Sequence, residues 1–361
     1  MFRGDPGRAG STGLLVGAAA GGIQVASAVA GLLVARGLGL ARYGEVAYFF
    51  SVFGMVVLLG SLGLSTQVTT EVAHLVGSGK IQSVGREIPV LLQARLATVG
   101  LVAAAAALVA IQGDRTVAAA AIAGGIALLA GFGFGMAQGL GRARLVVGLQ
   151  LGQALLYLGA VAFWASSAPE RVFAAVIGTY TISMLTVIVG CRGILARTIR
   201  VRGSIFAMSR AIVPLTGPVY FLTLLLAPYG AIAVLALGKA GAFESAADVS
   251  IALALASPLS GALATVIVAY YYPRLCALVA RQEPTCHELF EGFYRPAAAL
   301  GVLATIMLAV YPGELISLLY PARYLIVVAT VRAMAPAAGL LAVGQLLVWT
   351  LWAHGQARSA L

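Results

Sequence analysis

Apolar runs long enough to cross a bilayer follow one another through almost the whole of this 361-residue chain. About 20 consecutive apolar residues make a helix that spans the hydrocarbon core. The sequence therefore predicts an all-α, polytopic membrane protein with about ten transmembrane helices. The expected spans are 13–34, 46–68, 89–111, 117–140, 145–166, 172–193, 211–237, 247–271, 296–319 and 325–353.

The charged residues support this class and indicate the orientation of the chain. Only 10% of residues are charged, against about 25% in soluble domains, which excludes an ordinary soluble fold. The formal charge of +11 is spread over the ends of the apolar runs, so no patch for nucleic acid forms. With the N-terminus in the cytoplasm, 16 of the 23 lysines and arginines fall on the cytoplasmic side. The positive-inside rule then places both termini in the cytoplasm.

A basic interruption at 192–210 suggests two lobes. We expect an N-terminal six-helix lobe at 1–191, a cytoplasmic linker at 192–210 and a C-terminal lobe at 211–361. A weak internal repeat at a shift of 203 residues supports this division, although chance similarity in an Ala-, Leu- and Gly-rich chain competes with it. The repeat aligns Arg36 with Lys239, Glu45 with Asp248, Val46 with Val249 and Leu75 with Leu278. Both copies enter from the same side, which is typical of transporters with an axis along the membrane normal.

Glycines and prolines predict how the helices pack and bend. Gly131, Gly135 and Gly139 stand four residues apart, a spacing that lets two helix backbones approach closely in lipid. The same holds for Gly17 and Gly21. Prolines remove a backbone donor and bend a helix, either as static kinks or in the service of alternating access. They interrupt the seventh, eighth and tenth spans, at Pro214, Pro218, Pro228, Pro258 and Pro336.

Enzyme and metal motifs are absent from the sequence. It contains neither HExxH nor GxSxG, and His74, His287 and His354 are scattered at predicted cytoplasmic ends. Cys191, Cys276 and Cys286 lack metal-ligand spacing and lie on the predicted cytoplasmic side, which indicates free thiols. We therefore expect no enzyme, no metal and no cofactor.

The candidate functional residues are charges inside or at the rim of the spans. A charge in hydrocarbon costs a few kcal/mol or more, so it faces a bundle interior or cavity, or its side chain reaches the headgroups. Both interpretations stay open for each arginine. The cations are Arg36, Arg42, Arg95 and Lys239, and the carboxylates for coupling or for the cavity are Glu45 and Asp248. Glutamines along the spans and Tyr48, Tyr157, Tyr180, Tyr220, Tyr270 and Tyr271 could line a hydrophilic route.

One stretch resembles a known family. Ala35-Arg36-Gly37-Leu38-Gly39, Tyr43-Gly44 and Gly63-Leu64 resemble the opening of bacterial polysaccharide flippases. These belong to the multidrug/oligosaccharidyl-lipid/polysaccharide (MOP) exporter superfamily. The resemblance implies two lobes around a central cavity that opens alternately to either side of the cytoplasmic (inner) membrane. It also implies export of a lipid-linked oligosaccharide for surface polysaccharide synthesis. Family members carry cationic cavity residues at places that Arg36, Arg42 and Lys239 occupy here. We expect at least one of these three residues or Arg95 to contact the pyrophosphate of the polyprenyl carrier.

The resemblance has one departure and leaves two alternatives. The family has twelve or more spans, so a chain of ten has a shortened second lobe. Either the chain is a shortened or truncated member, or a partner, such as a polysaccharide-assembly protein or a second copy, completes the bundle. The first alternative is a cation-coupled drug exporter of the same superfamily. Such an exporter needs a carboxylate deep in a first-lobe helix, and no acidic residue lies in the middle of the first six predicted spans. The second alternative is a non-transporting membrane scaffold subunit.

Overall fold

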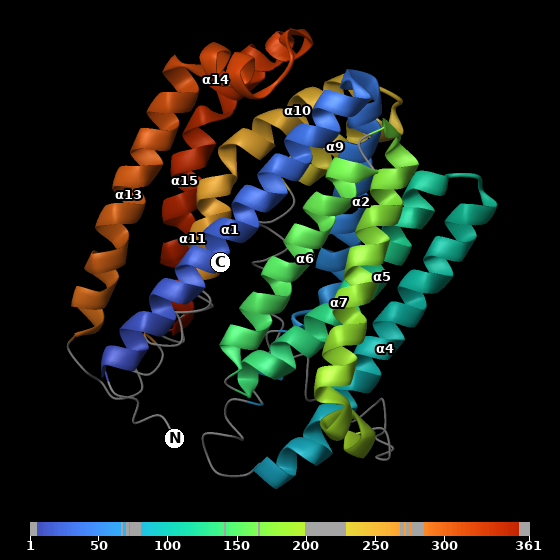
Figure 1. Cartoon of the computed structure of the whole chain (residues 1–361), viewed down its shortest axis with the longest axis vertical. Helices are drawn as coiled ribbons and strands as arrows, with labels where there is room; N and C mark the ends of the chain where they lie inside the picture. Colours follow the sequence, from blue (N-terminus) through green and yellow to red (C-terminus); the bar gives the residue numbers. More distant parts are fainter. Residues whose placement is uncertain are drawn as a thin grey trace. The chain divides into compact units, whose positions relative to one another are not determined.

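Every element of the computed structural model is a helix, within the residues that it describes (Figure 1). These residues are 6–65, 68–69, 72, 81–140, 142–164, 167–198, 229–267, 271, 275 and 285–353. The helices are α1 (Pro6–Leu38), α2 (Leu40–Ser61), α4 (Ile81–Ile111), α5 (Arg115–Gly139), α6 (Ala143–Phe163), α7 (Pro169–Thr198), α9 (Tyr229–Lys239), α10 (Phe243–Ala256), α11 (Pro258–Val266), α13 (Cys286–Val310), α14 (Pro312–Leu319), the 3-10 helix η3 (Ala322–Val327) and α15 (Val328–Ala353).

Eight of the described helices are long and apolar enough to cross a membrane, and the bent pair α10–α11 makes a ninth if it is one span. The chain is thus a multi-pass membrane protein, as its apolar runs predict. The predicted span at 211–237 lies outside the described residues except for α9, a short apolar helix.

Two predicted spans need correction, each for a reason in the backbone. The span at 46–68 was expected to continue without a break, but α2 ends at Ser61 because Leu62 and Gly63 adopt left-handed conformations. The ninth span runs from Cys286 to Val310 rather than over 296–319. Pro312 lacks a backbone donor and begins the separate helix α14.

The prolines in the described spans differ in their effect. Pro258 separates α10 from α11, and the two helices meet at a bend of 52°. Pro336, in contrast, lies inside helix α15, which continues through it from Val328 to Ala353. Pro214, Pro218 and Pro228 lie outside the described residues.

The helices form two compact units, and their boundaries differ from the predicted lobes. Unit 1 comprises residues 1–44 and 242–361, and unit 2 comprises residues 45–241. The first helix, α1, therefore belongs with the C-terminal helices, while α9 belongs with the helices of the first half. Of the predicted linker at 192–210, the residues up to Thr198 belong to α7, and 199–210 lie outside the described residues.

Contacts within unit 1 explain why it contains α1. This helix packs along α11, where Gly261 leaves room for the side-chain amide of Gln24, about 3 Å from where a Cβ would lie. Around them, α15 packs on α10, α11 and α13. Gly44, the last residue of the N-terminal part, lies directly against the backbone carbonyl of Phe243, which begins α10. A side chain at position 44 would therefore collide with main-chain atoms.

Unit 2 is built around α5, which packs on α4, α6 and α7. The glycines on α5 make the close approach that their spacing predicts. A Cβ on Gly135 would lie 2.6 Å from the carbonyl oxygen of Ser65, and one on Gly139 would lie 2.8 Å from that of Thr69. Gly21 on α1 has open space around it, so its expected role in close packing is not observed. In unit 2, Gly238 at the end of α9 packs against the ring of Tyr48.

Candidate functional site

Arg95 on α4 is completely buried and lies at the break in α2. Its exposed fraction is 0%. One terminal nitrogen donates to the carbonyl oxygen of Gly60 at 2.9 Å, and the other donates to the hydroxyl of Ser65 at 3.0 Å. The end of a helix leaves carbonyl groups without intrahelical partners and carries a partial negative charge, which a guanidinium satisfies. The third nitrogen, Nε, is buried without a hydrogen-bond partner.

Arg36 takes part in a reciprocal cap between two helix ends of unit 1. Its guanidinium donates to the carbonyl oxygen of Leu319, the last residue of α14, at 2.9 and 3.2 Å. In return, Arg323 of η3 donates to the carbonyl oxygen of Arg36 at 3.0 Å. The hydroxyl of Tyr324 donates to the carbonyl oxygen of Ala35 at 2.7 Å. The C-terminal ends of α1 and of the α14 segment are thus each held by a cation from the opposite segment.

The other two predicted cations are exposed. Arg42 lies in the first turn of α2, and Lys239 is the last residue of α9. Within the described part of the chain neither has a hydrogen bond or ion pair. Arg36 and Arg42 belong to unit 1, and Arg95 and Lys239 belong to unit 2. Each unit therefore holds two of the four predicted cations.

The two predicted carboxylates have the same kind of partner, each within its own unit. Glu45, near the start of α2, accepts from the hydroxyl of Thr116 at 3.5 Å. Asp248, near the start of α10, accepts from the hydroxyl of Thr330 at 3.0 Å. The threonines stand in the first turns of α5 and α15, where the positive end of a helix favours an anion. One oxygen of Asp248, Oδ1, is buried without a partner.

Aromatic rings from three helices gather in unit 2. Phe49 of α2 stacks on Phe173 of α7 with centroids 4.3 Å apart, and both are buried. Beside this pair, Phe50 meets Tyr157 of α6 edge to face, with centroids 6.5 Å apart. The remaining members are Phe53, whose ring lies 5.3 Å from that of Tyr180, and Gln153, which hydrogen-bonds with Tyr180. Amide, phenol and aromatic groups thus meet in the middle of membrane-spanning helices.

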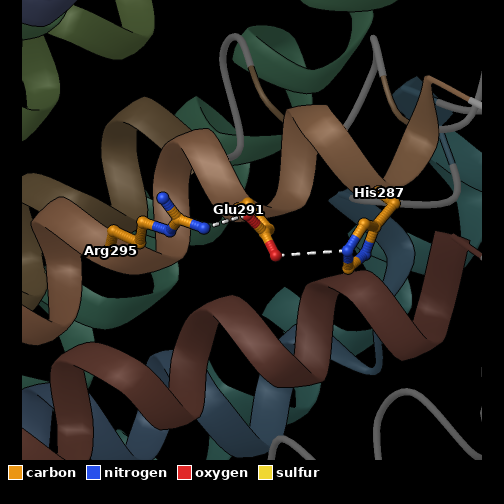
Figure 2. Close-up of polar contacts among 3 residues, drawn as sticks. All are labelled: His287, Glu291 and Arg295. Carbon is orange, nitrogen blue, oxygen red and sulfur yellow. Dashed lines mark hydrogen bonds and ion pairs between the residues drawn. The ribbon is translucent and has the colours of Figure 1, made fainter.

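An exposed charge network lies on the N-terminal half of α13 (Figure 2). Glu291 accepts from His287 at 3.2 Å and from Arg295, each one helical turn away. Such solvated pairs contribute about 0–1 kcal/mol, so we assign this network to the helix surface. His74 and His354 lie outside the described residues. Cys286, beside His287, is a free thiol.

The structure adds residues that the sequence analysis missed. Arg323 and Tyr324 hold the end of α1, and Thr116 and Thr330 bind the two carboxylates. One signal was available: the triplet Ala-Arg-Tyr occurs at 41–43 and again at 322–324. The two tyrosines of these triplets pack edge to face with ring centroids 6.5 Å apart.

The fold is that of the transporters of the MOP superfamily. No family model and no curated protein sequence matches the chain. Among solved structures, an inward-facing multidrug resistance MATE family transporter of this superfamily aligns with 93% of this chain and 82% of its own, at 14% identity and a TM-score of 0.65. The MATE multidrug transporter DinF-BH aligns with 99% of this chain and 85% of its own, at 14% identity and a TM-score of 0.59.

A third structure shows that this fold occurs with a different kind of pocket. It is a MOP superfamily transporter from Pyrococcus furiosus, described as having a binding pocket of reverse polarity that suggests a different function. It aligns with 99% of this chain and 85% of its own, at 13% identity and a TM-score of 0.53. At these identities the likeness establishes the fold and leaves the cargo to be argued from the residues.

Proposed function

We propose that this protein is a membrane transporter that flips a lipid-linked oligosaccharide across the bacterial cytoplasmic membrane by alternating access. The oligosaccharide is carried on polyprenyl pyrophosphate and serves surface polysaccharide synthesis. Its partners in this proposal are the lipid-linked oligosaccharide, membrane lipids, and a polysaccharide-assembly protein or a second copy of the chain. Both termini lie in the cytoplasm.

The observation that carries the proposal is the cationic character of unit 2 inside the membrane. Arg95 is fully buried in a membrane-spanning helix. The acidic residues of this unit whose side chains the structure describes stand near helix ends, at Glu45, Asp114 and Glu170. A helix bundle with this polarity suits an anionic headgroup such as a pyrophosphate, for which arginine is the preferred ligand. At least one of Arg36, Arg42, Arg95 and Lys239 contacts this headgroup in the proposal, and Glu45 and Asp248 are the candidate coupling groups.

The runner-up is a cation-coupled drug exporter, because two of the structural neighbours are multidrug transporters. A lipophilic cation needs an anionic or aromatic site, and the aromatic cluster of unit 2 is the feature that favours this alternative. A non-transporting scaffold is the third candidate.

The test is complementation of surface polysaccharide export in a flippase-deficient bacterium. We expect the wild-type chain to restore export and at least one of the variants R36A, R42A, R95A and K239A to lose it at normal abundance. A lost charge-assisted contact costs about 1.5–3 kcal/mol, or roughly 10- to 150-fold in affinity. The variant R295A on the exposed face of α13 is the matched control. Lower ethidium accumulation without restored export would indicate the drug exporter, and neither effect would indicate the scaffold.

A further inference from the structure

The aromatic cluster of unit 2 continues into a line of polar side chains on α6. Gln150, Gln153 and Tyr157 recur at intervals of three and four residues, so they lie on one face of the helix. Their side chains are half-buried. All three positions lie inside the candidate membrane span Leu145–Phe163, at least one helical turn from either end.

Hydrocarbon is an unfavourable environment for these groups. An amide without a partner costs several kcal/mol in lipid, because no water is present to bind it. Gln153 has a partner in Tyr180. Gln150 has no hydrogen-bond partner among the described residues, although its side chain is accessible. The face that carries Gln150 therefore suits water or a polar ligand better than it suits lipid tails.

The rings beside these amides are partly accessible as well. Phe50 is 37% exposed, and Phe53, Tyr157 and Tyr180 are half-buried, whereas Phe49 and Phe173 form the buried base of the cluster. The accessible part thus combines neutral amides, phenol hydroxyls and aromatic faces, without a carboxylate or a basic group among them. A sugar ring has the complementary chemistry, since its C–H face packs on an aromatic ring and its hydroxyls exchange hydrogen bonds with amides.

We propose that this face of unit 2, which we name the α6 face and define as Gln150, Gln153, Tyr157, Tyr180, Phe50 and Phe53, binds the sugar rings of the cargo. The inference rests on the proposed function and assigns the glycan part of the cargo to a place distinct from the cations. The amides and phenol hydroxyls among these rings favour a glycan, whose hydroxyls they can bind, whereas a lipophilic cation would use only the aromatic faces.

The test compares two probes that differ only in the sugar. A short-chain polyprenyl diphosphate and the same lipid carrying a disaccharide are titrated against the purified protein in detergent, with thermophoresis as the readout. We expect the wild-type chain to bind the sugar-bearing probe more tightly. Gln150→Leu and Tyr157→Leu should each reduce this preference by about fivefold to tenfold, the loss expected for one or two neutral hydrogen bonds or a ring contact. Affinity for the bare lipid should stay within about twofold, because this face carries no charge.

Two controls make the result specific. Phe163→Leu removes an aromatic ring that is 93% exposed at the end of α6, outside the α6 face, and should leave the preference unchanged. Thermal unfolding of each variant shows whether the fold is intact. Gln150→Leu is the most informative variant, because no described residue loses a hydrogen bond when this amide is removed.

Three results would overturn the inference: a wild-type chain without preference for the sugar-bearing probe, a preference that both variants retain, or equal displacement of both probes by ethidium. These outcomes are separate from the proposed function. A sugar preference that depends on the α6 face, together with failed complementation, would refute export and leave the glycan face standing. Restored export by both variants at wild-type efficiency, with an unchanged preference, would refute only the face.

Discussion

At the scale of single residues, Arg95 is the best-defined polar group in the membrane-spanning part of unit 2. Its position inside an apolar run marks it in the sequence as a candidate. Its partners do not follow from the sequence, because the break in α2 that exposes the Gly60 carbonyl depends on the backbone angles of Leu62 and Gly63. Leucine rarely adopts a positive φ, so a leucine at this position gives no signal in the sequence that the helix ends there.

Replacement of Arg95 by alanine should destabilise the protein by about 2–4 kcal/mol, since two acceptors at the break lose a charged donor inside the membrane. Ser65→Ala should cost less, because Gly60 keeps its donor. Thermal unfolding in detergent measures both changes. Arg171→Ala, at an exposed helix end, serves as the reference and should stay within about 0.5 kcal/mol of wild type. Equal melting temperatures for the Arg95 and Arg171 variants would contradict the role of Arg95 at the break.

At the scale of elements, the length and apolarity of the runs were sufficient to predict the helices, and the glycine spacing was sufficient to predict close packing by α5. Helix ends inside an apolar run were not predictable. The caps from Arg36 and Arg323 arise from contacts between segments about 280 residues apart, which periodicity does not encode.

The glycine contact of α5 leads to a paired prediction. Gly135→Ala should destabilise unit 2 by about 1–3 kcal/mol, because the new methyl group would lie 2.6 Å from a backbone oxygen that cannot move aside cheaply. Gly152→Ala on α6 introduces the same group into open space and should be neutral or stabilising by up to about 1 kcal/mol. Differential scanning calorimetry of the two variants in the same detergent measures this difference in stability. The opposite order of stabilities would show that the α5 contact is looser than described.

At the scale of the whole molecule, the fold class followed from the sequence, while the composition of the two units did not. The sequence places α1 before the first-half helices, yet its packing partners are α11 and the α14–η3 segment. For the candidate site, the sequence was sufficient to identify the charged residues inside or at the rim of the spans. Their distribution between the units and their threonine and tyrosine partners required the tertiary structure.

The orientation of the molecule is testable with reporter fusions. The distribution of lysine and arginine predicts that a reporter after Gly113 or Gly241 lies outside the cytoplasm and that one after Lys80 or Arg202 lies inside. Gly113 and Gly241 are suitable insertion points, because both adopt positive φ in turns between helices. A paired alkaline phosphatase and green fluorescent protein scan reads the two sides independently. A cytoplasmic reporter signal after Gly113 would contradict the predicted topology. The internal repeat would then no longer be supported by the topology.

Unit 1 is built from two separate stretches of the sequence, and this affects the order in which its helices are synthesised and packed. Residue 44 leaves the ribosome long before residue 242, and all of unit 2 is synthesised in the interval. At a synthesis rate of about 5–20 residues per second, α1 spends roughly 10–40 seconds in the membrane before α11 and α14 exist. During that time Gln24 and the carbonyl groups at the end of α1 lack the neighbours that they have in the finished protein. Helix α1 therefore reaches its final packing only after α11 and α14 have been synthesised.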